Sequence, residues 1–454
     1  MNEDSVARAV SSLQLPFDLR QYQRGGVMFL AQRDSALLAD DMGLGKTVQC
    51  IIAIAVLEKL AAVQRVLLVV PKSLRQNWKR EFDVWAPDLR ARLVNGSRSS
   101  RGAQYLLPIP LLIATYEQIR TDNDLFGRRE VFSLVVLDEA QRIKNRTSQT
   151  GLACTTIPRQ RSWALTGTPL ENRPEDLCGL FSFVRPGLLS RSLPVDEVHR
   201  SILPFFLRRT VDTALPELPD RIDQTIELEL DGDQRHEYER VWGERIQHRD
   251  RDGTLLAILT RLKQICNYLP ASASSCKLQA LNLIIENSLA MRSKVLVFSQ
   301  YVETLKWLQP RVPGGNPLIF HGGLSEHERA EVLDSFRRAG DTDVLLISLT
   351  AGSVGLNLQE ADVVVLYDRW WNPAIEEQAV RRAYRFGSTR PVQVFKLLVR
   401  NTVEERINEI LTRKQNLFDT YVEGLSTSPN EEVSESQLRW ILDVDSQKSG
   451  IARV

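Results

Sequence analysis

Cysteine and histidine are scarce in this chain, which contains five of each among its 454 residues. The cysteines form no C-x-x-C pair and no histidine stands beside them at ligand spacing, so we expect reduced thiols and no zinc site. No apolar run approaches the roughly 18 residues of a membrane span, and the polar start MNEDSVARAV does not resemble a signal peptide. Blocks of basic residues typical of nuclear import are also missing. These absences predict a cytoplasmic protein without a membrane segment.

A strong net charge is missing too. The formal net charge is +1, with 58 basic and 57 acidic residues. This balance neither indicates nor excludes a nucleic-acid partner, because acidic surface elsewhere can offset a basic groove. The chain is too long for one ordinary core, and its length suits two domains of about 200 residues each.

A glycine-rich turn is the clearest local motif. It has the sequence LLADDMGLGKT at residues 37–47, between an apolar run and an amphipathic stretch at residues 48–63. This order predicts a strand, a loop and a helix. Asp40 stands where the strict phosphate-loop pattern has its first glycine. The alternative is a chance glycine turn before a core helix.

The residues of this turn suit the phosphates of a nucleotide. Gly43 and Gly45 leave the backbone free to wrap a phosphate chain. Lys46 can reach the terminal phosphates, and the Thr47 hydroxyl can bind Mg²⁺. Upstream, the amide of Gln23 could meet the donor and the acceptor of an adenine edge, although a glutamine on a surface helix is usually only solvated.

Four further apolar runs end in polar residues and predict a parallel sheet with ligands at the carboxyl ends of its strands. The runs are Arg65–Val70, Leu111–Thr115, Leu134–Leu137 and Ser162–Leu165. The third run leads into Asp138 and Glu139. One carboxylate could bind Mg²⁺ and the other could orient an attacking water, or the pair could simply cap a strand end.

The middle of the chain predicts helices and a linker. Residues 170–218 lack strand alternation, are rich in proline and hold the basic pair Arg208-Arg209, so we interpret them as a helical insertion and linker. Residues 226–230 could form a strand that opens the second domain. Residues 234–268 have helical periodicity.

From Lys294 onward, strands and helices alternate again and predict a second parallel sheet without a phosphate loop. Its strands are expected at residues 295–299, 318–321, 344–348, 363–367 and 392–398. A helix predicted over residues 376–386 would place Gln378, Arg382 and Arg385 on one face. Such arginines could be a solvated stripe, but in a chain with a phosphate loop they are typical of fingers that complete an ATP site. The remaining predictions are a helix at residues 401–425, a polar linker at residues 426–435 and a short helix at residues 437–444.

In this order, the segments resemble the Swi/Snf family of superfamily-two helicase-like ATPases, from about residue 19 to residue 425. The family's adenine-reading motif and its motifs I, Ia, II and III are similar to LRQYQRGGVMFL, LADDMGLGKTVQ, VVPKSLRQNW, LDEAQRIKN and TGTPLEN. Two stretches peculiar to the family resemble PFFLRRT and LKQICNYL. The second-lobe series resembles VLVFSQY, FHGGLSEHER, SLTAGSVGLNLQEADVV, RWWNP and QAVRRAYRFGS.

The resemblance implies an α/β protein with two tandem RecA-like parallel-sheet lobes. They would span residues 1–219 and 220–425, with helical insertions at about 170–218 and 232–275, a brace helix at about 401–425 and a tail at 426–454. It also implies a set of ATP-site roles: adenine reading by Gln23, phosphate and Mg²⁺ binding by Gly43, Gly45, Lys46, Thr47 and Asp138, water activation by Glu139, arginine fingers at Arg382 and Arg385, and nucleotide contacts by Gly355 and Gln378. The implied DNA groove contains Lys72, Thr115, Gln300, Thr350, Asn357 and Trp371.

The chain departs from the family pattern at several positions. Gln141 stands where many members have histidine, which should be compatible with catalysis because the flanking acids remain. Arg381, Tyr384 and Ser388 replace the aspartate, histidine and glutamine of motif VI, so coupling between DNA and ATP is expected to be altered. Val211 replaces a lysine after the paired arginines. The first helical protrusion is shorter than the family's, which argues against a wide grip on DNA.

We predict an ATP-driven double-stranded DNA translocase whose chemistry is phosphoryl transfer from ATP to water with Mg²⁺. A strand-separating helicase is the nearest alternative. A DNA-binding scaffold with a decayed ATP site is a rival from another class, and the intact Lys46, Asp138 and Glu139 argue against it. No chromatin-reading, nuclease or zinc segment flanks the motor, so targeting is expected from a protein partner or is absent. Repair, remodelling and defence all remain open as pathways.

Overall fold

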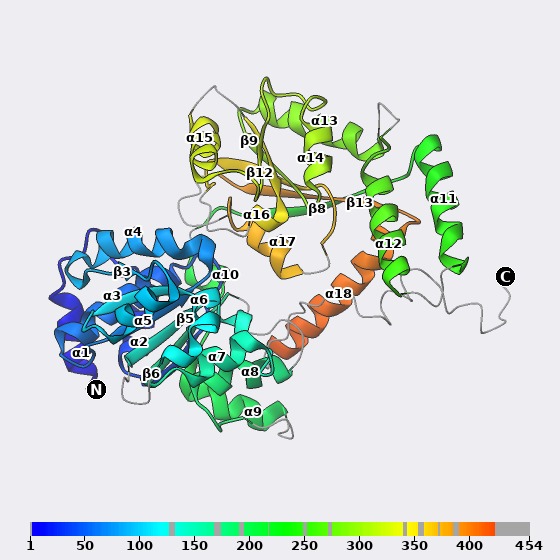
Figure 1. Ribbon diagram of the computed structural model, residues 1–454. Helices are drawn as coiled ribbons and strands as arrows, with labels where there is room; N and C mark the ends of the chain where they lie inside the picture. The colour runs from blue at the N-terminus through cyan, green and yellow to red at the C-terminus, as the bar shows by residue number, and fades with distance from the viewer. Residues whose placement is uncertain are drawn as a thin grey trace. The chain divides into compact units, whose positions relative to one another are not determined.

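The computed structural model describes residues 2–126, 132–167, 174–189, 195–216, 218–247, 252–270, 275–338, 343–352, 358–370, 373–384 and 390–422 (Figure 1). By its internal contacts the chain divides into two compact units, made chiefly of Met1–Pro216 and Glu217–Asn416. Each unit is built on one sheet in which every neighbouring pair of strands is parallel. The predicted fold class, α/β with two parallel sheets, is confirmed.

The sheet of the first unit has the strand order β3-β4-β2-β5-β6-β1-β7. Its strands are β1 (Ser35–Leu38), β2 (Val66–Val70), β3 (Arg92–Leu93), β4 (Leu111–Thr115), β5 (Phe132–Asp138), β6 (Arg159–Leu165) and β7 (Phe206–Leu207). Successive residues of a strand point to opposite faces, so Leu68 packs in one core and Leu67 in the other. Both faces are covered by helices, and this is why the inner strands are continuous apolar runs.

The helices of the first unit fall into two groups. Those on one face are α1 (Glu3–Ser11), α2 (Gln21–Ala31), α3 (Lys46–Lys59) and α4 (Arg75–Trp85). Those packed in the other core are α5 (Arg98–Leu106), α6 (Tyr116–Thr121), α7 (Gln149–Thr156), α8 (Pro174–Val184) and α9 (Val195–Ile202), and α10 (Val211–Ala214) follows β7. Helix α3 ends before the predicted residue 63, because Ala61 adopts a left-handed conformation with φ of 52°.

One prediction for the first unit is wrong in part. Residues 170–218 contain helices as predicted, but Phe206 and Leu207 form strand β7, which pairs in parallel with β1. The chain continues beside β1 beyond this strand, since the N–H of Asp41 donates to the carbonyl of Arg209 at 2.9 Å. The segment is therefore an edge of the sheet and not only a linker.

The sheet of the second unit has the strand order β10-β11-β9-β12-β13-β8. Its strands are β8 (Arg221–Leu228), β9 (Lys294–Ser299), β10 (Leu318–Phe320), β11 (Val344–Ser348), β12 (Ala361–Leu366) and β13 (Val392–Val399). Its helices are α11 (Gly232–Gln247), α12 (Asp252–Asn267), α13 (Cys276–Ala290), α14 (Val302–Leu308), α15 (Glu326–Arg337), α16 (Leu349–Gly352), α17 (Pro373–Val380) and α18 (Val403–Val422). Strand β8 begins five residues before the predicted residue 226, because it pairs with β13 along its whole length.

Two helices of the second unit bear on the predictions. Helix α17 ends at Val380, so the helix expected over residues 376–386 is confirmed through Val380 and is wrong over residues 381–384. After Val380, the N–H groups of Arg382 and Ala383 donate to carbonyls three residues back, and the carbonyl of Arg382 accepts from the N–H of Leu358 at 3.0 Å. Helix α18 begins at Val403 and packs against α11 and α12 through Val403, Ile407 and Leu411. The short helix predicted at residues 437–444 lies outside the described residues.

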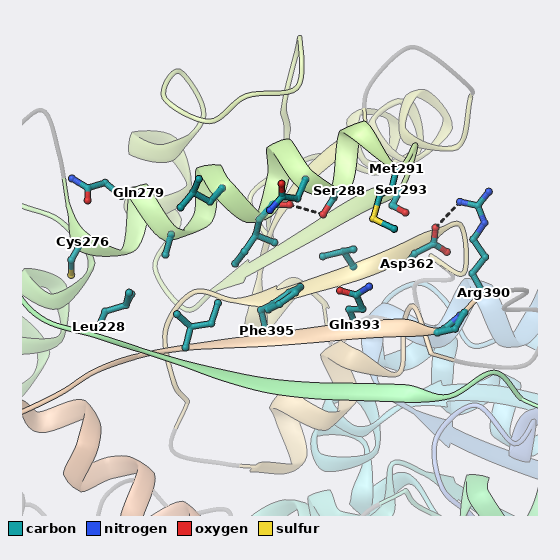
Figure 2. A pocket seen from close by; sticks show the side chains of 17 residues that line it. Leu228, Cys276, Gln279, Ser288, Met291, Ser293, Asp362, Arg390, Gln393 and Phe395 are labelled. Carbon is teal, nitrogen blue, oxygen red and sulfur yellow. Dashed lines mark hydrogen bonds and ion pairs between the residues drawn. The ribbon is translucent and has the colours of Figure 1, made fainter.

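An open groove of about 940 Å³ lies between α13 and strands β8, β12 and β13 (Figure 2). Its lining is largely apolar and includes the exposed Leu283 and Met291. At one end, Arg390 and Asp362 form an ion pair at 3.3 Å. Of the predicted site residues that the structure describes, none lines this groove. Within the same described parts, no helix is long and apolar enough to cross a membrane.

Candidate active site

The glycine-rich turn after β1 forms a loop that closes on the start of α3. Gly43 and Gly45 have φ of 88° and 72°, a left-handed conformation that glycine adopts without steric cost. Gly45 is the residue before the first turn of α3, so Lys46 and Thr47 lie in that turn. Unpaired N–H groups at the start of a helix attract anions. The loop therefore has the backbone of a phosphate-binding site.

Lys46 is held over this loop. Its Nζ donates to the carbonyls of Asp40 at 2.6 Å and Asp41 at 3.2 Å. Burial lowers the pKa of Lys46 from its usual value, while nearby carboxylates, led by Glu139, oppose that shift. A Cβ on Gly167 would lie only 3.5 Å from this Nζ, so the start of the TGTPLEN segment borders the lysine.

Asp40 is part of a buried clamp that sequence reasoning did not find. Its side chain is fully buried, and its two carboxylate oxygens accept from Nε of Arg209 at 2.9 Å and from the same guanidinium's Nη2. Gln49 of α3 donates to Asp40 at 3.1 Å and accepts from Arg209 at 2.9 Å. Arg209 also donates to the carbonyl of Tyr22. The clamp thus joins α2, the phosphate loop, α3 and the chain after β7.

Gln23 lies against the phosphate loop. Its Oε1 accepts from the N–H of Arg20 at 3.0 Å, an arrangement that caps the start of α2. A Cβ added to Gly45 would lie 2.7 Å from Nε2 of Gln23. Glycine at position 45 therefore allows the amide of Gln23 to approach the loop, where an adenine-reading group is expected.

The acidic pair lies at the carboxyl end of β5. One oxygen of Asp138 accepts from the indole N–H of Trp78 at 2.7 Å, and its carbonyl accepts from the hydroxyl of Tyr116 at 2.6 Å. Burial, and then the neighbouring Glu139, raise the pKa of Asp138 above its usual range, while Trp78 and Lys46 oppose the shift. Glu139 has φ of 51°, which is unfavourable for a residue with a side chain. Such local strain is concentrated at functional sites.

A short chain of hydrogen bonds holds Glu139. Nε2 of Gln141 donates to Oε2 of Glu139 at 2.7 Å. The hydroxyl of Thr166 donates to Oε1 of Gln141 at 2.7 Å. Gln141 therefore connects Glu139 to the segment after β6.

The residue types fit ATP with Mg²⁺. Magnesium is usually bound by one or two protein oxygens together with substrate phosphates. The carboxylate of Asp138 and the hydroxyl of Thr47 are such donors. Among the described residues, no group of three or more His, Cys, Asp or Glu is arranged as a metal site of its own.

The predicted positions of the second unit are only partly described. Gln378 is half-buried on α17, and Arg382 is half-buried in the turn after it. These two residues therefore do not share the face of one regular helix. Arg385 and Gly355 lie outside the described residues.

The predicted DNA positions differ in exposure. Lys72 is exposed in the short helix η1 (Lys72–Leu74) that follows β2. Thr115 is buried, and its hydroxyl accepts from the N–H of Gln118 to cap α6. Gln300 is half-buried after β9, and the backbone of Thr350 belongs to α16. Asn357 and Trp371 lie outside the described residues.

Comparison with known proteins connects this geometry to a family. The chain matches the SNF2-related domain over residues 22–270 and the helicase conserved C-terminal domain over residues 276–387. It is 34% identical to an uncharacterized ATP-dependent helicase of Mycoplasma pneumoniae, over 90% of this chain and 42% of that protein. It is 33% identical to a putative ATP-dependent helicase/translocase of Bacillus subtilis, over 91% of this chain and 50% of that protein. Among solved structures, the SWI2/SNF2 ATPase core of Sulfolobus solfataricus in complex with dsDNA is 29% identical over 96% of both chains, with a TM-score of 0.45.

The phosphate loop follows β1, the acidic pair follows β5 on the other side of β6, and the second unit contains another parallel sheet, which is the combination predicted for a helicase-like ATPase. The SNF2-related domain alone matches more than half of the chain. The chain therefore belongs to the SNF2-related family, as the sequence motifs predict. It spans half or less of the length of the two helicase relatives described above.

Proposed function

We propose that this protein is a DNA-dependent ATPase that moves along double-stranded DNA. The proposal rests on one arrangement of hydrogen bonds. Thr166 bonds to Gln141, which bonds to Glu139, and a carbonyl of the phosphate loop accepts from Lys46. An acid fixed in this way suits the orientation of a water for attack on a phosphate. The Bacillus subtilis relative, named a putative ATP-dependent helicase/translocase, is consistent with the same activity.

The first unit contains groups for each part of the nucleotide. The amide of Gln23 would meet the adenine edge. The loop N–H groups and Lys46 would hold the phosphates, and Thr47 and Asp138 would hold Mg²⁺. The metal ion would neutralise charge that develops on the phosphate oxygens. Glu139 would orient the water.

Hydrolysis is proposed to need groups from both units. The sequence of the second unit contains no phosphate-loop motif, but it contains Arg382 and Arg385. Guanidinium groups stabilise the charge of a transferring phosphoryl group, and they do so bidentately. A cycle of ATP binding and hydrolysis would then change the relation of the two units, which is how lobed ATPases produce a step.

DNA binding is proposed to involve backbone phosphates and no base reading. Lys72 is the exposed basic residue among the candidate positions in the first unit, whereas the side chain of Thr115 is buried as a helix cap. In the second unit, Gln300 is the candidate whose side chain the structure describes. Targeting to a particular structure would come from a protein partner.

The test is the ATPase rate with duplex DNA, single-stranded DNA, RNA or no nucleic acid, each over a salt series. We expect duplex DNA to raise turnover most, and log affinity for DNA to fall linearly with log salt concentration. Glu139→Gln is the control, because it should bind ATP and leave it intact. Turnover that no nucleic acid raises, or an affinity insensitive to salt, would contradict the proposal.

A further inference from the structure

The second unit contains a buried cluster of charged side chains that none of the predicted roles uses. It has equal numbers of cations and carboxylates, each at most 6% exposed: Lys263, Lys277, Arg369, Asp368, Glu376 and Glu404. They come from α12, α13, the segment after β12, α17 and α18. Burying charges costs free energy unless each finds a partner, and a hydrophobic core is often as stable. A role in fixing geometry is therefore a reasonable expectation for such a cluster.

One part of the cluster holds the backbone near Gln300. The carboxylate of Asp368 accepts from the N–H of Gln300 at 3.0 Å and from the amide of Asn267 at 3.0 Å. Lys263 donates to the carbonyl of Arg369 at 2.9 Å. The segment around Asp368 is thus bonded both to a predicted DNA position and to α12.

Another part holds the same segment to α17. Nε and Nη2 of Arg369 donate to the two oxygens of Glu376, each at 3.0 Å. Glu376 also accepts from the N–H of Trp370 at 2.8 Å. Arg369 donates in addition to Asn408 of α18. Because Glu376 lies on α17, displacement of the Arg369–Trp370 segment has to move this helix or break these charge-assisted bonds.

Helix α17 leads directly to Arg382. The N–H of Arg382 donates to the carbonyl of Ala379 in the last turn of that helix, at 3.1 Å. The bonded path therefore runs from Gln300 through Asp368 and Arg369 to Glu376, and from there along α17 to the proposed finger. Every step in it is a hydrogen bond, an ion pair or a single short element.

We propose that the Arg369–Glu376 ion pair couples DNA contact at the segments of Gln300 and Trp370 to the placement of Arg382. Glu376 is then a positioning residue for DNA-stimulated ATP hydrolysis. The inference rests on the proposed function, because it assumes that DNA raises turnover. It adds the group that relays the effect of DNA within the second unit.

The test compares Glu376→Gln with a matched control, Glu237→Gln. Glu237 makes the same two-bond pair with Arg240, at 2.7 Å for both bonds, but on the exposed face of α11 and outside the cluster. For each variant we would measure turnover without DNA, turnover with saturating duplex DNA, the Kd for that DNA and the Tm. Coupling energies of this kind correspond to changes of a fewfold to about thirtyfold.

In Glu376→Gln we expect the stimulation by DNA to fall by about tenfold. Turnover without DNA and the Kd for DNA should change by less than about threefold, and Glu237→Gln should match the wild type in all four measurements. Equal losses with and without DNA would show a merely structural role and overturn the inference. Unchanged stimulation in Glu376→Gln would overturn it too.

A second variant covers the case in which Glu376→Gln does not fold. Asn408→Ala removes one partner of Arg369 at a half-buried position and keeps the Glu376 pair. It should reduce the stimulation by about threefold without changing turnover in the absence of DNA, and full stimulation in this variant would contradict the inference. A wild type that DNA does not stimulate would instead contradict the proposed function itself.

Discussion

Asp40 occupies a position that the strict phosphate-loop pattern gives to glycine, and its surroundings explain the exchange. Its carboxylate is fully buried against the guanidinium of Arg209 and the amide of Gln49. A buried carboxylate is tolerated only with such partners. The loop therefore obtains from a side-chain clamp part of the fixed shape that other loops obtain from glycine.

Arg209→Ala should destabilise the first unit by about 3–5 kcal/mol, because it leaves the buried charge of Asp40 without its partner. Urea unfolding followed by tryptophan fluorescence would measure the change. Arg98→Ala is the control, since Arg98 pairs with Asp124 at an exposed site and its loss should leave the stability almost unchanged. Equal effects of the two variants would rule out the clamp as a stabilising feature.

Trp78→Phe should move the acid limb of the pH profile of kcat/KM to higher pH. The indole N–H donates to the carboxylate of Asp138 and so favours its ionised form, which is the form that binds Mg²⁺. Without that bond, the pKa of Asp138 should rise further, by about one unit, given that hydrogen bonds to charged groups contribute roughly 1.5–3 kcal/mol.

Trp85→Phe provides the control for this shift. Trp85 lies on the same helix, α4, and packs against Phe17 with ring centroids 5.9 Å apart. Its loss should leave the pH profile in place. A profile that does not move in Trp78→Phe, at an unchanged Tm, would refute the assigned role of Trp78.

Among the helices, α2 packs unusually closely on α3. A Cβ on Gly26 would lie 1.7 Å from Oε1 of Gln49, whose amide is held by Asp40 and by the carbonyl of Leu44. Gly26→Ala should therefore break the clamp, destabilise the first unit by about 1–3 kcal/mol and raise the KM for ATP. Gly25→Ala is the matched control. Its Cβ would meet only Arg209, at 3.5 Å, so stability should be kept or slightly improved.

The strands show how far sequence patterns reach. Continuous apolar runs predicted β2, β4, β9 and β11 to within one residue at each end, because strands buried on both faces need such runs. Strand β7 was not predicted, because two residues are too few to show the alternating pattern of a strand. Only its pairing with β1 defines it. The end of α17 was not predicted either, because the carbonyl of Arg382 after this helix accepts a hydrogen bond from the distant Leu358.

The candidate site also has a part that sequence patterns predict and a part that they do not. The turn before α3 and the place of Asp138 and Glu139 at the end of β5 could be predicted, because each is contiguous in sequence. The contacts of Arg209 with Asp40 join positions 169 residues apart, and those of Thr166 with Gln141 join positions 25 apart. Single-sequence patterns contain no information on such pairs, although the paired arginines in PFFLRRT gave a hint.

Taken as a whole, the molecule should hydrolyse ATP only when both units contribute. Arg382→Ala and Arg385→Ala should keep ATP binding, because the loop of the first unit is intact, while turnover falls by roughly 10³-fold or more. Fluorescent ATP-analogue binding and phosphate release measure the two effects separately. Arg390→Ala is the control: Arg390 is an exposed arginine in the same unit, paired with Asp362. Near-normal turnover in either finger variant would disprove the role of that arginine.

Movement along duplex DNA should occur without strand separation. Translocation needs only alternating contact with the phosphates of one strand, whereas unwinding needs a rigid element between the strands and about 1.4 kcal/mol per base-pair step. The described elements of the predicted insertion at residues 170–218 are the helices α8, α9 and α10, the short helix η5 (Leu203–Phe205) and the short strand β7, which belongs to the first sheet. None of these described elements is a projecting hairpin.

Paired assays with ATP would follow displacement of a third strand from a triplex and release of a labelled strand from a forked duplex. Triplex displacement alone is the expected result, and fork unwinding at a comparable rate would make the protein a strand-separating helicase.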